Sequence, residues 1–326
     1  MRELGEAPQA LAQAGEPRFG SFRGGLPRMD FGAIPKGKLW QLLHKKRWAY
    51  GAIADENVFV GAAIVSLGYA ASALFFVLDR KAKTMLVDRS LLGPGSAVTF
   101  TDEGSGLRGA KFEIGRTRML IGDEGVTIDV AGDPPSYALF RARSTGAAPI
   151  AAVVPIEGGF ANATEKRLFG GGGEVVAAGK RFVLDDASYA VDHTHGYLSR
   201  HTSWRWALGM GRASSGERVA FNLVEGFVGE AECGVWIDDE LFGLGEGIFE
   251  YDAEKPESAW RIRSKCGAVD LRFSPSALHR EEKDLVVIRS HFVQPAGDFE
   301  GTIDLGQRRV TFSGIPGVTE HQDVLW

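Results

Sequence analysis

The densest group of reactive side chains in this 326-residue sequence lies between residues 192 and 206. Asp192, His193 and His195 stand together, and three of the seven histidines fall within nine residues. In an extended strand, neighbouring side chains point to opposite faces, so His193 and His195 would share one face and Asp192 would lie on the other. Two histidines placed in this way can act as an acid–base pair or share a metal ion.

The same residues could instead form an exposed polar loop whose histidines are solvated by water. Trp204 and Trp206 follow closely and argue against that interpretation. A histidine beside a large apolar wall is held in place, and its pKa is shifted. We therefore treat this segment as the first candidate for catalysis.

A metal ion would need a third ligand besides His193 and His195. The spacing does not choose among the candidates, which are Glu232, His291, Glu320 and His321. We assign no metal, and a metal-dependent enzyme remains an alternative that metal analysis of untagged protein would decide. No phosphate loop, dinucleotide fingerprint, Gly-x-Ser-x-Gly elbow or HExxH pair occurs, so no cofactor is predicted.

A second cluster of polar residues precedes Trp236 and consists of Asn222, Glu225, Glu230 and Glu232. Paired carboxylates at a suitable separation could support glycoside hydrolysis. A solvated face of a strand is the more common explanation for such a spread of acidic residues.

Composition limits the function classes. The net charge is −5, and the most basic tract is only Lys45–Arg47, so nucleic acid is not an expected partner. Two cysteines, Cys233 and Cys266, exclude a disulfide framework and suit a reducing compartment. The N-terminus has no apolar core of the signal-peptide type, and the expected location is cytoplasmic.

One uncharged run, residues 57–78, is long enough to cross a bilayer. Gly61 and Gly68 interrupt it, and it divides into two β-rich halves around the small residues of GYAA. We predict a buried hairpin and no membrane span.

The elements around these residues are mostly short apolar runs closed by Gly, Asp or Pro, a rhythm typical of a sandwich or barrel. Residues 37–48 suit a short amphipathic helix that leads into a strand. Trp204, Trp206, Leu208 and Met210 should share one face of a strand, and Val219, Phe221 and Leu223 one face of the next. A shift to Gly and Pro over 146–174 predicts a domain junction. The expected division is a flexible arm at 1–20, a domain at 21–160 and a domain at 161–326 that carries the site.

From Gly173 onward the sequence resembles the carotenoid 1,2-hydratase and attH-like group. The resemblance rests on an Asp-His pair at the end of a strand, an aromatic strand SWRWALG and a strand ERVAFNL. Over its whole length the chain is more similar to the domain-of-unknown-function family 2804. The matching features are Lys46-Arg47-Trp48, Thr164-Glu165-Lys166, DHTHGYLSRHTSWRWA, WRIRSKCGAVDLRFSP, HFVQPAGDFEG and the ending EHQDVLW.

This resemblance implies an all-β fold of two lipocalin-like (calycin-type) antiparallel barrel or sandwich halves packed together, around a rather apolar cavity. Asp192 would match the acidic residue of the pair, His193 its partner, and Trp204 with Trp206 the aromatic pair. His195 stands where the group has an acidic or aromatic residue, and Arg205 stands where an Asp is common. The substrate is therefore not fixed by the resemblance.

The favoured hypothesis is a lyase, hydratase or isomerase acting on a small apolar unsaturated molecule. A buried, protonated Asp192 would donate a proton, His193 or His195 would orient it or take the proton back, and the tryptophan faces would steady a cation. The predicted catalytic residues are Asp192, His193 and His195, and the predicted substrate-binding residues are Tyr197, His201, Trp204, Trp206, Asn222, Glu232 and Trp236. The alternative is a non-catalytic carrier or sensor of a hydrophobic small molecule. Long β-edges favour a homodimer.

Overall fold

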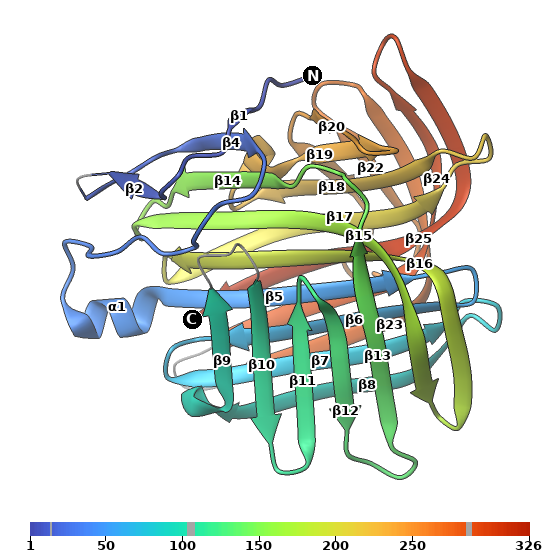
Figure 1. Ribbon diagram of the computed structural model, residues 1–326, viewed down its shortest axis with the longest axis horizontal. Helices are drawn as coiled ribbons and strands as arrows, with labels where there is room; N and C mark the ends of the chain where they lie inside the picture. The colour runs from blue at the N-terminus through green and yellow to red at the C-terminus, as the bar shows by residue number, and fades with distance from the viewer. Residues whose placement is uncertain (14, 103–107, 285–288) are drawn as a thin grey trace. The chain divides into compact units, whose positions relative to one another are not determined.

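The computed structural model describes residues 1–13, 15–102, 108–284 and 289–326 (Figure 1). In these ranges the chain is almost entirely β-structure, which confirms the predicted fold class. Contacts divide it into two units. We call Gly5–Val77 with Leu86–Arg200 the N-terminal unit, and Met1–Leu4, Leu78–Met85 and His201–Trp326 the C-terminal unit.

The N-terminal unit is built on one sheet with the strand order β8-β7-β6-β5-β16-β15-β13-β12-β11-β10-β9. A second branch leaves β15 through β14 and β4 to β1, and only the pair β1–β4 is parallel among the pairings described. The strands are β1 (Gly5–Glu6), β4 (Gly20–Arg23), β5 (Lys45–Ala54), β6 (Val58–Ser66), β7 (Ala70–Asp79), β8 (Thr84–Pro94), β9 (Val98–Asp102), β10 (Arg108–Ile114), β11 (Thr117–Gly122), β12 (Gly125–Val130), β13 (Ser136–Ser144), β14 (Ile150–Pro155), β15 (Ala161–Ala177) and β16 (Lys180–Tyr197).

The sheet of this unit curls so that β9–β13 pass across β5–β8, as Figure 1 shows in green over blue. The inward residues of both layers form one core. Ile53 and Val60 come from the first layer, and Phe112, Ile121 and Phe140 come from the second. Strands of alternating apolar residues produce this arrangement because every second side chain faces the same layer. The predicted hairpin at 57–78 is confirmed as β6 and β7, and no helix in the described ranges could cross a membrane.

Two long neighbouring strands, β15 and β16, connect the branches of the sheet. β15 pairs with β14 over its first part and with β13 over its second. The run Gly170–Gly173, which the composition shift predicts to be part of a junction, lies within β15. A Cβ on Gly173 would lie 1.9 Å from the carbonyl oxygen of Leu139, so glycine is needed where the strands approach this closely.

The N-terminal segment lies over the β14–β15–β16 region and forms a second core. It includes the ribbon of β2 (Ala12–Gln13) and β3 (Glu16–Pro17) and the helix α1 (Lys38–His44), which leads into β5. The helix is shorter than predicted, because residues 45–48 already pair with β16 as part of β5. Leu11 and Leu26 are each 1% exposed and pack with Ala163 and Tyr197. The burial of Leu11 shows that part of the predicted arm is packed, and its flexibility stays a prediction.

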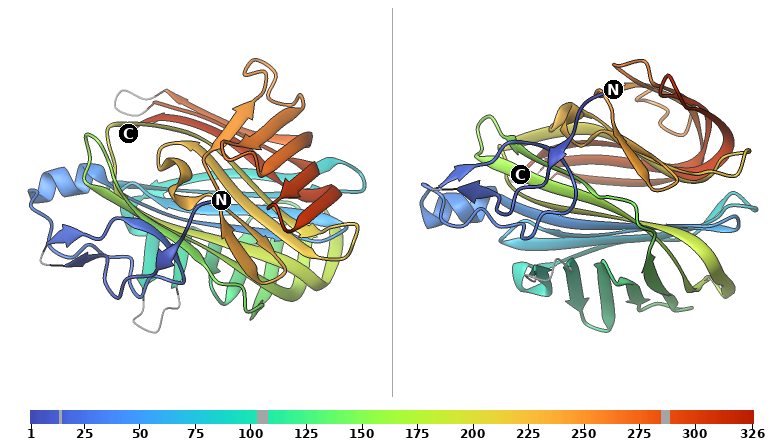
Figure 2. Two further views of the ribbon diagram at one scale, coloured as in Figure 1. Left: turned by 90° about the horizontal axis from the view of Figure 1, so that it is seen from above. Right: turned by 45° about the horizontal axis from the view of Figure 1, so that its top comes forward.

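The C-terminal unit is a nine-stranded antiparallel sheet with the order β20-β19-β18-β17-β25-β24-β23-β22-β21. Figure 2 shows its orange to red strands bending into an arc. The strands are β17 (His201–Arg212), β18 (Arg218–Gly226), β19 (Gly234–Ile237), β20 (Glu240–Gly243), β21 (Gly247–Glu250), β22 (Trp260–Ser264), β23 (Val269–Asp284), β24 (Arg289–Asp304) and β25 (Arg309–Leu325). The short 3-10 helix η2 (Gly229–Glu232) lies between β18 and β19, and η1 (Gly95–Ala97) lies between β8 and β9.

The residues on the two faces of this sheet are grouped as the alternation in the sequence predicts. Directly paired residues of antiparallel strands share a face. Trp206 pairs with Val224 and Glu320, whereas Gly209 pairs with Phe221. The tryptophans therefore share one face of β17, and Phe221 packs on the other face, 4.9 Å from the ring of Phe299.

The contacts group residues 161–200 with the N-terminal unit, because β16 pairs with β5 from Ser188 to Tyr197. Asp192, His193, His195 and Tyr197 consequently belong to the N-terminal unit, and the other predicted site residues belong to the C-terminal unit. Whether independently folding domains divide near residue 160 stays a prediction.

Candidate functional site

Residues 191–197 form the last part of strand β16, so side chains alternate between its faces. His193 and His195 lie on one face with Tyr197, and Asp192 lies on the other. Asp192 pairs with Lys166 of β15 and Tyr50 of β5, whereas His193 pairs with Glu165 and Ala49. Neighbours in sequence are therefore placed in two different environments.

Asp192 lies in a cluster that we call the Asp192 cluster, formed with Thr164, Lys166 and Thr194. The Lys166 Nζ atom lies 2.7 Å from the Asp192 carboxylate, and both side chains are largely buried. Lys166 also donates to the Thr164 hydroxyl at 2.7 Å, and both threonine hydroxyls lie 3.4 Å from Asp192 Oδ1. An ammonium this close stabilises the charged carboxylate, so the cluster contains a base next to a cationic hydrogen-bond donor.

Asn162 shares the face of Thr164 and stands opposite Gly196. Its side chain is fully buried, and both amide atoms lack a hydrogen-bond partner among the described residues. A Cβ on residue 196 would lie 2.3 Å from Asn162 Oδ1, so glycine is required there. Because buried polar groups are normally paired, this amide retains hydrogen-bonding capacity beside the Asp192 cluster.

On the opposite face, His193 belongs to what we call the buried ion network. Its Nε2 atom lies 3.6 Å from Asp123 Oδ1. Burial raises the pKa of Asp123, but His193, the charge of Arg167 and the backbone amide of Arg108 outweigh this and leave the pKa lowered.

Glu165 is the centre of the buried ion network and is fully buried. It accepts from Arg108 Nη1 at 2.8 Å and from the backbone N–H of Leu26 at 2.6 Å, and it pairs with Arg167. Arg167 in turn pairs with Asp123 at 3.1 Å. The network joins β10, β11, β15 and the N-terminal segment, so it fixes the packing of that segment.

His195 is also enclosed. Its Nδ1 atom bonds with the carbonyl oxygen of Met29, and its ring packs 5.9 Å from Phe31 and 5.8 Å from Tyr197. Burial, with the charge of Arg47, lowers the pKa of His195 to about 3, so the ring is neutral near pH 7. Tyr197 is 4% exposed in the same aromatic group.

These positions bear on the predicted roles. Asp192 makes its contacts with Lys166 and the threonines, whereas His193 contacts Asp123 on the other face. His193 and His195 are both buried, and their catalytic roles stay predictions. Lys166 and Asn162 were missed by the sequence-based reasoning. The alternation of Thr164-Glu165-Lys166 beside an expected strand was the available signal for Lys166, whereas no local pattern marks Asn162.

In the C-terminal unit, the predicted residue Trp204 holds a buried carboxylate. Its indole N–H donates to Glu320 Oε1 at 2.7 Å, and Gln294 donates to Glu320 Oε2 at 2.6 Å. Gln294 is fully buried and Glu320 is 7% exposed. Sequence-based reasoning considered Glu320 only as a metal ligand and missed Gln294, because their neighbours come from strands distant in sequence.

Trp206 and Asn222, also predicted, contact one another. Trp206 Nε1 donates to Asn222 Oδ1 at 2.7 Å, and Asn222 Nδ2 donates to the carbonyl oxygen of Glu232 at 2.8 Å. Glu232 lies in η2 and is buried, whereas Glu225 pairs with Arg205 at 2.6 Å. The polar cluster before Trp236 is thus divided between several partners.

The remaining two predicted residues lie apart from these contacts. Trp236 is 1% exposed on β19 opposite Ala220. The side chain of His201 is exposed and lies 3.1 Å from Asp323.

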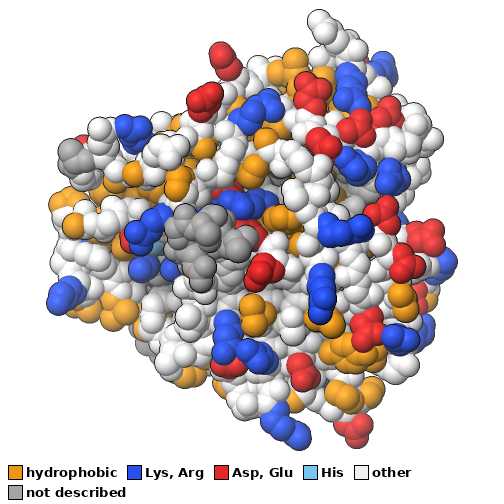
Figure 3. All heavy atoms as spheres, in the orientation of Figure 1, with side chains coloured by type: hydrophobic (Ala, Val, Ile, Leu, Met, Phe, Trp, Pro, Cys, Tyr) orange, Lys and Arg blue, Asp and Glu red, His pale blue; other side chains and the backbone are white. Residues whose placement is uncertain are grey.

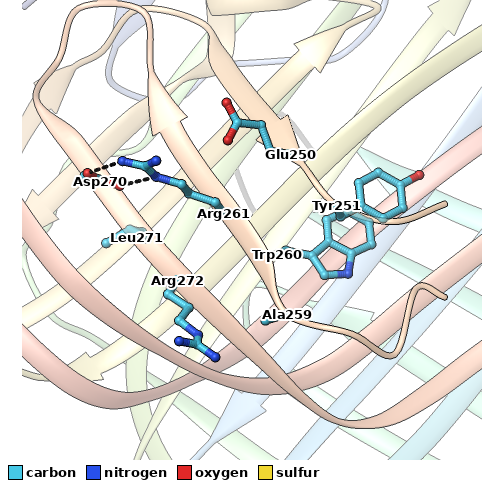
Figure 4. A pocket seen from close by; sticks show the side chains of 8 residues that line it. All are labelled: Glu250, Tyr251, Ala259, Trp260, Arg261, Asp270, Leu271 and Arg272. Carbon is cyan, nitrogen blue, oxygen red and sulfur yellow. Dashed lines mark hydrogen bonds and ion pairs between the residues drawn. The ribbon is translucent and has the colours of Figure 1, made fainter.

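A cavity of about 490 Å³ opens on β21–β23, and several of its lining residues belong to the segment WRIRSKCGAVDLRFSP, to which the sequence assigned no site. Figure 4 shows Tyr251 beside Trp260, with Arg261 paired to Asp270. The rings of Tyr251 and Trp260 stack at 3.6 Å, and Tyr251 Oη lies 2.5 Å from His321 Nδ1. Burial and then the charge of Arg205 lower the pKa of His321. None of the predicted site residues lines this cavity.

A metal site was one alternative for the two histidines of β16. Within the part of the chain that the structure describes, no three His, Cys, Asp or Glu side chains are grouped to hold a metal ion. His193 and His195 share a face but have separate partners, Asp123 and the Met29 carbonyl.

Comparison with known proteins adds a family and a fold. The family described as "Domain of unknown function (DUF2804)" matches residues 1–326. No curated protein matches the sequence. Two solved structures align well. CghA crystallised with Sch210972 has a TM-score of 0.53 and 12% identity over 98% of this chain and 97% of its own. Kievitone hydratase from Nectria haematococca has a TM-score of 0.50 and 12% identity over 90% and 94%.

A looser likeness connects the chain with a protein of Nitrosomonas europaea that is provisionally described as an AttH. Its TM-score is 0.43, with 9% identity over 85% of this chain and 91% of that chain. The likenesses to CghA and kievitone hydratase establish a shared fold, and function has to be argued from the residues.

Proposed function

Because the chain belongs to the family of domain-of-unknown-function 2804 proteins and has the fold of kievitone hydratase and CghA, we propose that it is an acid–base enzyme of the hydratase or isomerase type. Its substrate is a small, largely apolar unsaturated molecule, and Asp192 is the proton-transferring group. The observation that carries the proposal is the Asp192 cluster, in which a carboxylate and an ammonium lie 2.7 Å apart.

The chemistry of Asp192 and Lys166 limits the types of reaction that the site could catalyse. A carboxylate can accept a proton from water, and the neighbouring Lys166 ammonium can stabilise an oxygen on which negative charge develops. This combination suits a double bond conjugated to a carbonyl group. It differs from the sequence-based expectation, an acid acting on an isolated double bond, because the side chain next to Asp192 is the amine of Lys166.

In the proposed hydration, the oxygen of water bonds to the carbon distant from the carbonyl, and Asp192 takes the proton of that water. The electrons of the double bond move to the carbonyl oxygen, which Lys166 stabilises. Asp192 then returns the proton to the carbon next to the carbonyl. Water is added without an oxidant or reductant, and the reverse order removes it.

Asn162, Thr164 and Thr194 support the same proposal as positioning groups. The threonine hydroxyls bond to the carboxylate, and the Asn162 amide has no hydrogen-bond partner among the described residues. A non-catalytic carrier could use the same face, so the decisive readout is turnover.

The first step of the test is mass spectrometry of an organic extract of natively purified protein, which selects the probes. The chain is then incubated with conjugated enones in heavy-oxygen water. We expect heavy oxygen in the new β-hydroxyl group of the hydrated product, and Asp192→Asn should reduce its formation by about 10²–10⁴-fold. Asp185→Asn is the matched control, because Asp185 is exposed on the same strand.

Two outcomes would contradict the proposal. Full turnover by Asp192→Asn would remove Asp192 from the chemistry. A ligand that binds tightly and is released unchanged by the native chain would identify a carrier.

A further inference from the structure

The helix α1 presents its apolar face outward. Leu39, Leu42 and Leu43 follow the i, i+3, i+4 spacing of one helical face. Their exposed fractions are 70%, 45% and 49%, and no residue of α1 is fully buried. A surface helix of a globular protein normally turns such a face to the core. These leucines therefore expose apolar surface that is normally buried.

The orientation of α1 is fixed by its other face. Trp40 and His44 stack at 4.0 Å, and Trp40 also packs 6.1 Å from Tyr197 of β16. His44 Nδ1 lies 2.6 Å from the carbonyl oxygen of Leu198. Because these contacts hold the helix from below, the leucines cannot turn inward without breaking them.

The exposed apolar surface continues onto the turn between β6 and β7. A Cβ on Gly68 would lie 2.6 Å from the carbonyl oxygen of Leu42, so the turn and the helix touch. Tyr69, the next residue, is 36% exposed. We call Leu39, Leu42, Leu43 and Tyr69 the α1 patch. Figure 3 shows hydrophobic side chains gathered at the left, where α1 lies in Figure 1.

The surroundings of the α1 patch are basic although the chain as a whole is acidic. Residues 31–54 contain five Lys and Arg and no Asp or Glu, against a net charge of −5 for the chain, although Lys46 is buried and the exposed Asp30 lies just before this range. Lys36 and Lys38 are exposed at the start of the helix. Arg200 is exposed too, and its charge acts on Tyr69. An apolar patch surrounded by cationic side chains is complementary to a surface whose outer layer is anionic and whose interior is apolar.

We propose that the α1 patch binds an anionic membrane surface, with the leucines at the boundary of the acyl chains and the basic side chains among the headgroups. The helix is too short to span a bilayer and would lie on it. A second copy of the chain fits less well, because a two-fold contact would bring like-charged margins together. This inference is independent of the proposed reaction.

The test is co-sedimentation of the full chain with vesicles of phosphatidylcholine, with or without phosphatidylserine. We expect binding to the anionic vesicles at low salt and its loss at high salt, because screening weakens the attraction. The double variant Leu39→Ser with Leu43→Ser, and separately Lys36→Glu with Lys38→Glu, should each weaken binding about tenfold or more.

Matched controls are Val183→Ser, which removes an exposed apolar side chain from β16, and Lys255→Glu, which changes an exposed charge in the C-terminal unit. Both should bind as the parent chain does. No sedimentation of the parent chain with anionic vesicles would overturn the proposal, as would equal losses in the controls. A dimer that the Leu39→Ser and Leu43→Ser variant dissociates would assign the patch to a second copy and also overturn it.

Discussion

The two faces of strand β16 differ in the charged groups that surround them. On the His193 face, the ring contacts Asp123, and the adjoining Glu165 is held by arginines and a backbone amide. On the Asp192 face, the side chain is 13% exposed, and the nearby Asn162 amide has no partner among the described residues. Within the described ranges, buried atoms without a hydrogen-bond partner occur on both faces, among them His193 Nε2 and His195 Nε2, so the two faces differ in their ion pairs and not in whether polar atoms are left unpaired.

This difference teaches that reactive residue types do not by themselves mark a site. The buried ion network contains more charged groups than the Asp192 cluster, but its groups are used in joining β10, β11, β15 and the N-terminal segment. Buried ion pairs of this kind specify packing, and removing one partner leaves an uncompensated charge. The comparison predicts that changes on the two faces separate stability from activity.

The largest expected effect is on stability and comes from Glu165→Gln. It would leave Arg108 and Arg167 without their buried carboxylate, at a cost of about 3–5 kcal/mol in the free energy of unfolding. Chemical unfolding followed by tryptophan fluorescence measures this. Glu113→Gln, at an exposed pair, is the control and should leave the unfolding midpoint unchanged. A Glu165→Gln protein as stable as its parent would break the comparison.

A smaller effect is the pH dependence of the free energy of unfolding that His195 causes. Because burial lowers its pKa in the folded state to about 3, the unfolded chain binds a proton below pH 6.5 that the folded chain does not. Stability is therefore complete above about pH 6.5 and falls between pH 6.5 and 3, by at most about 1.4 kcal/mol per pH unit.

The variant His195→Gln removes that titration. Its unfolding free energy should fall less steeply than that of the parent between pH 6.5 and 4.5, whereas above pH 7.5 the two pH profiles should run parallel. Urea titrations at a series of pH values provide the measurement. Equal slopes in the acid range would show that His195 is not held neutral in the folded chain.

Much of the fold could be predicted from the sequence because strand signals are local. The division of residues 57–78 into β6 and β7 follows from small residues at the turn, and the alternation in β17 follows from its period of two. The glycine run of β15 could not be interpreted in this way. Glycine serves both in loops and where strands approach closely, and only the pairing with β13 decides between these uses.

The site was predictable only in part, for the same reason. The period of two predicted that Asp192 lies on one face of the strand and that His193 and His195 lie on the other, and the structure has the same arrangement. The partners of Asp192 depend on the register between β15 and β16, which brings Lys166 opposite Asp192 and Asn162 opposite Gly196. A one-residue change of register would have exchanged Glu165 for Lys166, and the sequence of either strand alone does not fix that register.

The smallest expected effect on stability is that of replacing Asn162, which we compare with replacing the buried Asn222. Asn162 has an unpaired amide, whereas the amide of Asn222 bonds to Trp206 and to the Glu232 carbonyl. Asn222→Leu should cost about 1–3 kcal/mol, because it leaves the indole N–H without its acceptor, whereas Asn162→Leu should change stability by less than about 1 kcal/mol, in either direction. If the Asn162 amide serves a bound molecule, Asn162→Leu should still lower turnover of a conjugated enone about tenfold. Unfolding and turnover measured on the same preparations decide the matter. A large loss of stability with unchanged turnover would show that Asn162 has a structural role and does not act on substrate.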